Sequence, residues 1–130
     1  MSLFSIFSGS KTPEYPTDTL PLNEDQQLKF TFFKHASFAI EYASRHIYID
    51  PVSEYAEYSK LPKADVVLVT HSHYDHFDRA AIDDLTTHES IIVCDKTSAE
   101  GFEGECFLMT PGLKAKAFDK IIIEAVAAYN

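Results

Sequence analysis

Four side chains able to bind a metal ion lie within a single hexapeptide: His71, His73, Asp75 and His76. In a chain that leaves a strand, residues two apart point to the same side, so His71 and His73 can present two imidazoles to one ion. Asp75 and His76 lie further along the turn and can reach a second ion nearby. Imidazole and carboxylate ligands suit zinc, and also iron or manganese. Because three of the six histidines crowd into this segment, a metal site explains it better than a chance surface loop.

Regular elements on both sides are needed to hold this cluster in place. The run over residues 64–70 is apolar and β-branched, which is typical of a strand buried on both faces. It leads directly into the histidines. Asp78 is a good N-cap, and the apolar spacing after it predicts a helix over residues 79–87. The cluster is therefore expected in a short loop between a rigid strand and a helix.

The remaining elements are mostly strands. Alternation predicts a half-buried strand over residues 37–42, placed between strands over 29–33 and 46–50, with a turn at 43–45. Further strands are expected over residues 90–95, 106–110, 113–118 and 121–127, with a short helix or turn over 96–101. This order predicts an α/β protein (α+β in some schemes) with a mixed β-sheet and helices on one face.

Composition limits the class of protein. A chain of 130 residues with 45% hydrophobic residues fits one folded domain, preceded by an extended or poorly ordered leader over the Pro-containing residues 1–27. The formal net charge of −9 disfavours broad docking on nucleic acid. No signal peptide or membrane span is recognisable, so a cytoplasmic protein is expected. Cys94 and Cys106 are expected to be free thiols, although one disulfide between them stays open.

The pattern His-x-His-x-Asp-His after a β-branched strand ending in Thr resembles the signature motif of the metallo-β-lactamase superfamily. Residues 34–40, 47–51 and 64–70 are similar to the branch that contains the ascorbate-phosphate lactonase, the phospholipase D that releases N-acylethanolamines, and bacterial metal-dependent hydrolases. The resemblance covers about residues 29–130. It implies that residues 28–130 form the N-terminal half of a four-layer αββα sandwich.

The resemblance also implies roles for individual residues. His71 and His73 would bind a first metal, and Asp75 and His76 a second, with two Zn²⁺ per complete site and Mn²⁺ or Fe²⁺ as alternatives. Asp75 would be catalytic, orienting the nucleophilic water or accepting its proton. Asp50, before Pro51, would brace the site through hydrogen bonds. His35 would lie near the site, and a buried structural histidine is an equal alternative for it.

The second half of the family's fold supplies another His, an Asp and a last His, whereas His88 is the one histidine after His76 in this sequence. We therefore expect an N-terminal half that a second copy (a homo-oligomer) or a complementing C-terminal half must cover. The implied reaction is hydrolysis of a small-molecule ester, lactone or phosphodiester by a metal-activated water. The alternative is a catalytically inactive half-domain that acts as a binding or assembly module. A nuclease of the same superfamily is disfavoured by the acidic charge.

Overall fold

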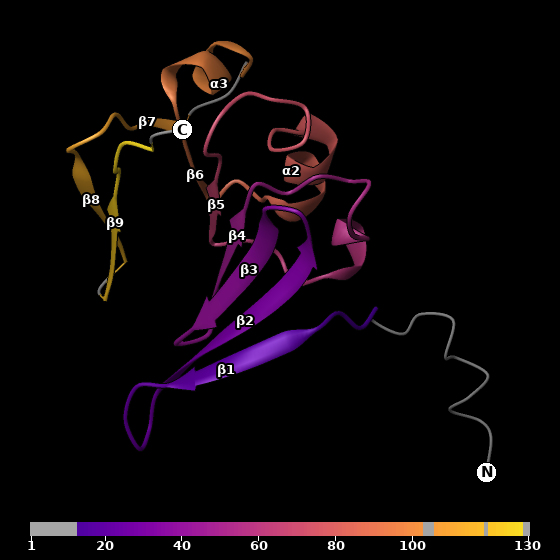
Figure 1. Ribbon diagram of the computed structural model, residues 1–130, viewed down its shortest axis with the longest axis vertical. Coiled ribbons are helices and arrows are strands. Elements are labelled where there is room, and N and C mark those ends of the chain that lie inside the picture. The colour runs from indigo at the N-terminus through magenta and orange to yellow at the C-terminus, as the bar shows by residue number, and fades with distance from the viewer. Residues whose placement is uncertain (1–12, 103–105, 119, 129–130) are drawn as a thin grey trace.

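Seven strands form one mixed sheet in the computed structural model, which describes residues 13–102, 106–118 and 120–128. The strands are adjacent in chain order: β1 (Thr17–Pro21), β2 (Gln27–Lys34), β3 (Ser37–Tyr42), β4 (Arg45–Ile49), β5 (Val66–Leu68), β6 (Ile91–Cys94) and β7 (Phe107–Leu108). The other elements are the 3-10 turn η2 (Tyr58–Lys60), the helices α2 (Arg79–Leu85) and α3 (Lys96–Glu100), and a separate hairpin of β8 (Lys114–Phe118) and β9 (Ile121–Glu124) (Figure 1).

The sheet changes from antiparallel to parallel at β4. Strands β1 to β4 pair antiparallel through short turns, and the β3–β4 turn places Ala43 and Ser44 at φ of 50° and 64°. Positive φ at both turn residues matches the right-handed twist of the flanking strands. From β4 to β7 the pairs are parallel, and parallel neighbours need crossover connections. These crossovers carry η2, α2 and α3, so within the described residues the helical segments follow the antiparallel strands.

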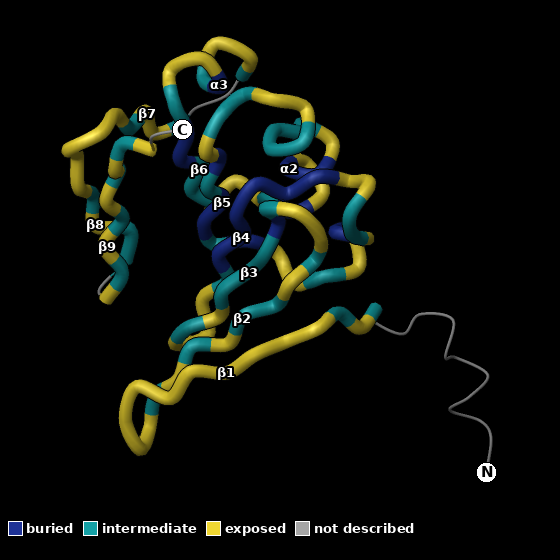
Figure 2. The backbone as a smooth tube through the Cα atoms, viewed as in Figure 1, coloured by how far each residue is buried: buried dark blue, intermediate teal, exposed yellow. Residues whose placement is uncertain are grey.

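Two apolar clusters lie on opposite faces of the sheet, because successive strand residues point to opposite sides. Tyr48 and Val67 face α2, whereas Ile47 and Val66 face the β8–β9 hairpin. The most buried backbone runs through β4, β5 and β6, between these two layers (Figure 2). The helix-side cluster includes residues of both helices, Ala81, Ile82, Leu85 and Ala99. The mixed sheet with helices on one face is thus confirmed.

Most expected elements are present with shifted ends. The strand at Ser37–Tyr42 has the predicted bounds, and α2 begins at Arg79 after the cap Asp78. The strand expected over residues 64–70 is shorter, Val66–Leu68. Of the leader expected over residues 1–27 as extended or poorly ordered, residues 1–12 lie outside the described residues, and Thr17–Pro21 is an extended edge strand that pairs with β2. Backbone pairing holds β1, since all five of its residues are exposed.

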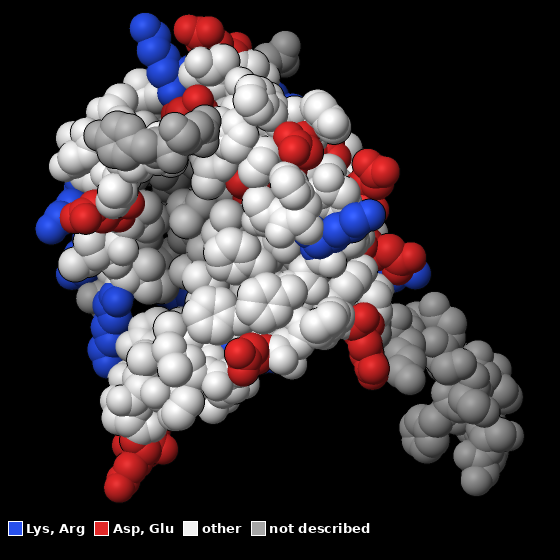
Figure 3. Space-filling model, in the orientation of Figure 1, with Lys and Arg blue, Asp and Glu red and all other residues white. Residues whose placement is uncertain are grey.

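The surface agrees with the acidic composition. Figure 3 shows acidic side chains spread mainly along the periphery of the face in view, with a wide uncharged area between them. Within the described residues, no helix is long and apolar enough to cross a membrane.

Candidate metal centre

The cluster lies in the loop from Thr70 to Phe77, between β5 and α2. The backbone amides of His76 and Phe77 both donate to the carbonyl of His73, each at 2.9 Å, which closes the loop into a turn. Asp78 then anchors the end of the loop, because its carboxylate accepts from Ala80 N at 3.0 Å and from Ser53 N at 2.8 Å. The loop is therefore fixed at both ends, as a preorganised ligand site requires.

The buried carboxylate of Asp50 is the centre of the hydrogen-bond network. Asp50 follows β4 with φ of 44°, is 1% exposed, and its amide donates to Leu68 O at 2.8 Å. Its Oδ1 accepts from Thr70 N at 2.7 Å, and its Oδ2 accepts from Thr70 Oγ1 at 2.6 Å. Oδ2 also lies 2.7 Å from His76 Nδ1. These contacts join the ends of two parallel strands to the ligand loop.

This network fixes which imidazole nitrogens are available. Thr70 Oγ1 has one hydrogen, which it gives to Asp50, so it must accept from His71 Nδ1 at 2.9 Å. His71 therefore carries its proton on Nδ1 and leaves Nε2 free to bind a metal. The contact of His76 Nδ1 with the Asp50 carboxylate sets the same tautomer for His76. Both rings thus direct Nε2 away from Asp50 and Thr70.

His35 reaches the loop from the turn between β2 and β3. An irregularity in the β2–β3 register between Phe32 and Lys34 precedes it, and His35 itself has φ of 56°. Its Nε2 lies 3.0 Å from Asp75 Oδ2, with the two side chains 49% and 27% exposed. The alternative of a buried structural histidine therefore does not fit. A bulge or kink of this kind is a common way to re-aim a side chain beside a site.

The electrostatics around Asp75 favour its carboxylate form. Desolvation on its own raises the pKa of Asp75, but a hydrogen bond from its own backbone and the neighbouring His76 and His35 outweigh it. The net result is a pKa below the usual range for an aspartic acid. Asp75 is thus an anion beside two imidazoles, which is the charge state that a cation site needs.

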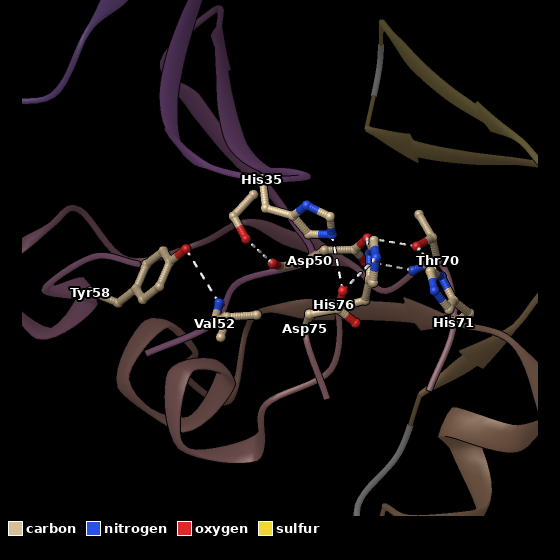
Figure 4. Close-up of polar contacts among 9 residues, drawn as sticks. His35, Asp50, Val52, Tyr58, Thr70, His71, Asp75 and His76 are labelled. Atoms are coloured by element: carbon tan, nitrogen blue, oxygen red, sulfur yellow. Dashed lines mark hydrogen bonds and ion pairs between the residues drawn. The ribbon is translucent and has the colours of Figure 1, made fainter. Parts of the chain in front are cut away.

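Two groups of potential ligands result, and they share His76 (Figure 4). His35, Asp75 and His76 form one group, and Asp50, His71 and His76 form the other, with the ligand atoms of each within 4.8 Å of one another. His73 joins neither group among the described residues, although its ring centroid is 4.7 Å from that of His71. The pair His71 and His73 therefore has no third ligand in this part of the chain.

Thr70 was not singled out from the sequence, although it links Asp50 to His71. Its position at the end of the β-branched run, directly before His71, is the signal that could have identified it. Tyr58 packs in the helix-side core. Tyr55 lies close to the site, with its ring centroid 6.4 Å from that of His35.

A groove of about 800 Å³ runs beside the loop. Its walls include His71 and His73 on one side and residues 124–128, at and after the end of β9, on the other. The free thiols of Cys94 and Cys106 are near this wall, with their sulfur atoms 3.0 Å apart. The groove gives a small molecule access to the imidazoles from the hairpin side of the sheet.

Comparison with known proteins identifies the fold. The family model described as a beta-lactamase superfamily domain matches residues 29–130. The chain belongs to the metallo-β-lactamase superfamily. A crystal structure from Parabacteroides distasonis, of a protein provisionally assigned as a metal-dependent hydrolase, superposes with a TM-score of 0.84 and 34% sequence identity. The match covers 89% of this chain and 52% of that one, so this superfamily member corresponds to half of the solved fold.

A second superfamily relative agrees with the first. A UPF0173 metal-dependent hydrolase of Flavobacterium johnsoniae is 41% identical over 54 residues, which are 38% of this chain and 24% of the relative. The chain therefore spans about half the length of the solved relative, and its matched segment spans about a quarter of the curated one. The recognition of the superfamily from the His-x-His-x-Asp-His motif is thus confirmed.

Proposed function

We propose that this chain provides the N-terminal, metal-binding half of a hydrolase that cleaves a small-molecule ester, lactone or phosphodiester. The observation that carries the proposal is that His76 belongs to two clusters of potential ligands, one with Asp75 and one with His71, and that the Asp50–Thr70 network leaves Nε2 free on both imidazoles. Relatives described as metal-dependent hydrolases support the same reaction class.

The donor set fits a divalent cation. Two imidazoles and a carboxylate suit Zn²⁺, with Mn²⁺ and Fe²⁺ as alternatives, and two ions would serve the complete site. Such ions lower the pKa of water toward neutrality and polarise the oxygen of the scissile group. Asp75 would orient the attacking water or take up its proton, since it is anionic at neutral pH. Asp50 and Thr70 would keep the imidazoles aligned during this step.

The proposed activity needs a covering partner. Apolar side chains stay exposed on β7, on β9 and in the segment after β9, and a second copy of the chain or a separate C-terminal half could cover them; they are Phe107, Leu108, Ile122 and Val126. The same exposed surface favours the second candidate, an inactive half-domain that serves as a binding or assembly module. Catalytic turnover distinguishes the hydrolase from the assembly module, since both are expected to associate with a covering partner.

The test combines metal content with activity. The purified chain, after incubation with Zn²⁺ and gel filtration, is analysed by plasma mass spectrometry, and its oligomeric state is read by light scattering. Aryl esters, a lactone and bis(p-nitrophenyl) phosphate are then offered as substrates. At least about one ion per chain, with turnover that disappears in the His71→Ala variant but not in His88→Ala, supports the hydrolase.

Other outcomes decide against it. Bound metal and self-association without turnover on any of the three substrate classes would favour the assembly module. Less than about half an ion per chain would mean that this chain does not bind metal on its own.

A further inference from the structure

The two ligand groups differ in how free their ligand atoms are. In the group of Asp50, His71 and His76, both carboxylate oxygens of Asp50 already hold hydrogen bonds, and Oδ2 holds the Nδ1 of His76. A cation there would have to displace hydrogen bonds to a carboxylate that is only 1% exposed. Asp50 therefore acts as a brace for the imidazoles, not as a ligand.

The other group presents three atoms toward one point. His35 Nε2 lies 3.0 Å from Asp75 Oδ2, and His76 Nε2 lies 3.7 Å from the same oxygen. Ligand atoms at about 2.0–2.1 Å from a tetrahedral zinc ion are about 3.3 Å apart, so these separations fit a shared ion with little movement. The Nδ1 of His76 is held by Asp50, which leaves its Nε2 to face Asp75.

The three residues come from two connections that are far apart in the sequence. His35 is in the β2–β3 turn, and Asp75 and His76 are in the loop after β5, so the fold brings them together across 40 positions of sequence. Figure 4 shows the His35 ring directed toward Asp75 and His76, and its centroid is 5.1 Å from that of His76. The left-handed backbone at His35, φ of 56°, gives its side chain this direction.

We propose that His35 is a direct ligand of the cation held by Asp75 and His76. This inference rests on the proposed metal requirement of the site. With His35, the described half of the fold contains a complete set of two imidazoles and one carboxylate, which leaves one tetrahedral position for water or substrate. The chain then binds one cation through its own residues, without a ligand from a second half.

The test compares His35→Asn with the control His88→Asn. Asparagine tolerates the left-handed backbone at position 35, and His88 is a histidine 90% exposed and away from the cluster. Zinc affinity is measured by competition with a chromogenic chelator at less than one equivalent of zinc, and circular dichroism checks folding. We expect affinity about 10–100-fold weaker in His35→Asn and unchanged in His88→Asn.

A measurement on the unmodified chain covers the case in which His35→Asn does not fold. Diethylpyrocarbonate modification is mapped by mass spectrometry with and without zinc, and zinc should protect His35 while His88 stays reactive. Zinc bound with wild-type affinity by a folded His35→Asn variant, or no protection of His35, would overturn the role of His35 and leave the metal site standing. A wild-type chain that binds no zinc would overturn both proposals.

Discussion

The carboxylate of Asp50 lies 2.7 Å from Nδ1 of His76, although the two residues are separated by a strand, a crossover and most of the ligand loop. Because Asp50 is buried and also binds both the amide and the hydroxyl of Thr70, it couples the geometry of the loop to the ends of β4 and β5. The ends of β4 and β5 therefore set the orientation of the proposed ligands.

Replacement of this brace should weaken the metal site and the fold together. In Asp50→Ala the Thr70 amide and His76 Nδ1 lose their buried partner, so we expect a loss of about 1–3 kcal/mol in the free energy of unfolding. Zinc affinity should fall about 10–100-fold. Urea unfolding and chelator competition measure the two effects. Asp83→Ala, an exposed carboxylate on α2, should stay within about 0.5 kcal/mol of wild type, and equal effects of both variants would contradict the role of Asp50.

The core beneath α2 should be sensitive to cavity formation. Leu85 is fully buried in the helix-side cluster, whereas Leu22 is exposed. Leu85→Ala should cost about 2–5 kcal/mol of unfolding free energy, since it removes a packed side chain and leaves a void. The same change at Leu22 should cost no more than about 0.5 kcal/mol. Thermal or urea unfolding compares them, and a mild effect at Leu85 would place α2 outside the cooperative core.

Two buried tyrosines should make stability fall at alkaline pH. Burial raises the pKa of Tyr58 to about 12 and, with Tyr58 as its neighbour, raises that of Tyr48 further. The unfolded chain ionises near pH 10, so the folded state holds these protons more tightly. Their contribution is full below about pH 10 and is lost as pH rises through 10–12. The urea midpoint at pH 8, 10 and 11 tests this.

A matched pair of variants isolates the effect of the tyrosines. Tyr58→Phe should flatten the alkaline fall in the urea midpoint, because it removes one of the two phenols. Tyr74→Phe changes an exposed ring and should leave the fall as it is. A native chain whose phenolate absorbance at 295 nm rises fully by pH 10.5 would contradict the burial of these hydroxyls.

The exposed apolar side chains beside the groove should drive self-association. Ile122 is on β9 and Val126 follows it, and both are well exposed. The double variant Ile122→Lys with Val126→Lys should shift the chain toward monomer in sedimentation velocity, because it places two charges in the apolar surface. Leu20→Lys, on the distant edge strand β1, is the control. A wild-type chain that is already a monodisperse monomer would refute the association.

Local patterns in the sequence predicted much of the fold. The strand at Ser37–Tyr42 followed from strict alternation, and the start of α2 followed from the cap at Asp78, because both signals depend on neighbours in sequence. The edge strand at Thr17–Pro21 was missed. Its residues are all exposed and include a proline, so no apolar pattern marks a strand that backbone pairing alone holds.

The site was predicted as a set of residues but not as a set of contacts. The hexapeptide identified His71, His73, Asp75 and His76 by type and spacing, yet the structure groups His76 with His35 and Asp50 and leaves His73 outside both groups. Those partners directly follow other strands, and local spacing in the sequence does not predict which distant strands pair. The tautomers of His71 and His76, which depend on Thr70 and Asp50, needed the same tertiary information.

The sequential strand order has a consequence for biosynthesis. Each strand from β2 to β7 pairs with the strand made just before it, so the sheet can extend one strand at a time as the chain leaves the ribosome. At about 5–20 residues per second, the 41 positions from His35 to His76 emerge within about 2–8 s. The nascent chain can therefore bring the proposed cation ligands together before β6 emerges from the ribosome, and capture of the ion can accompany translation.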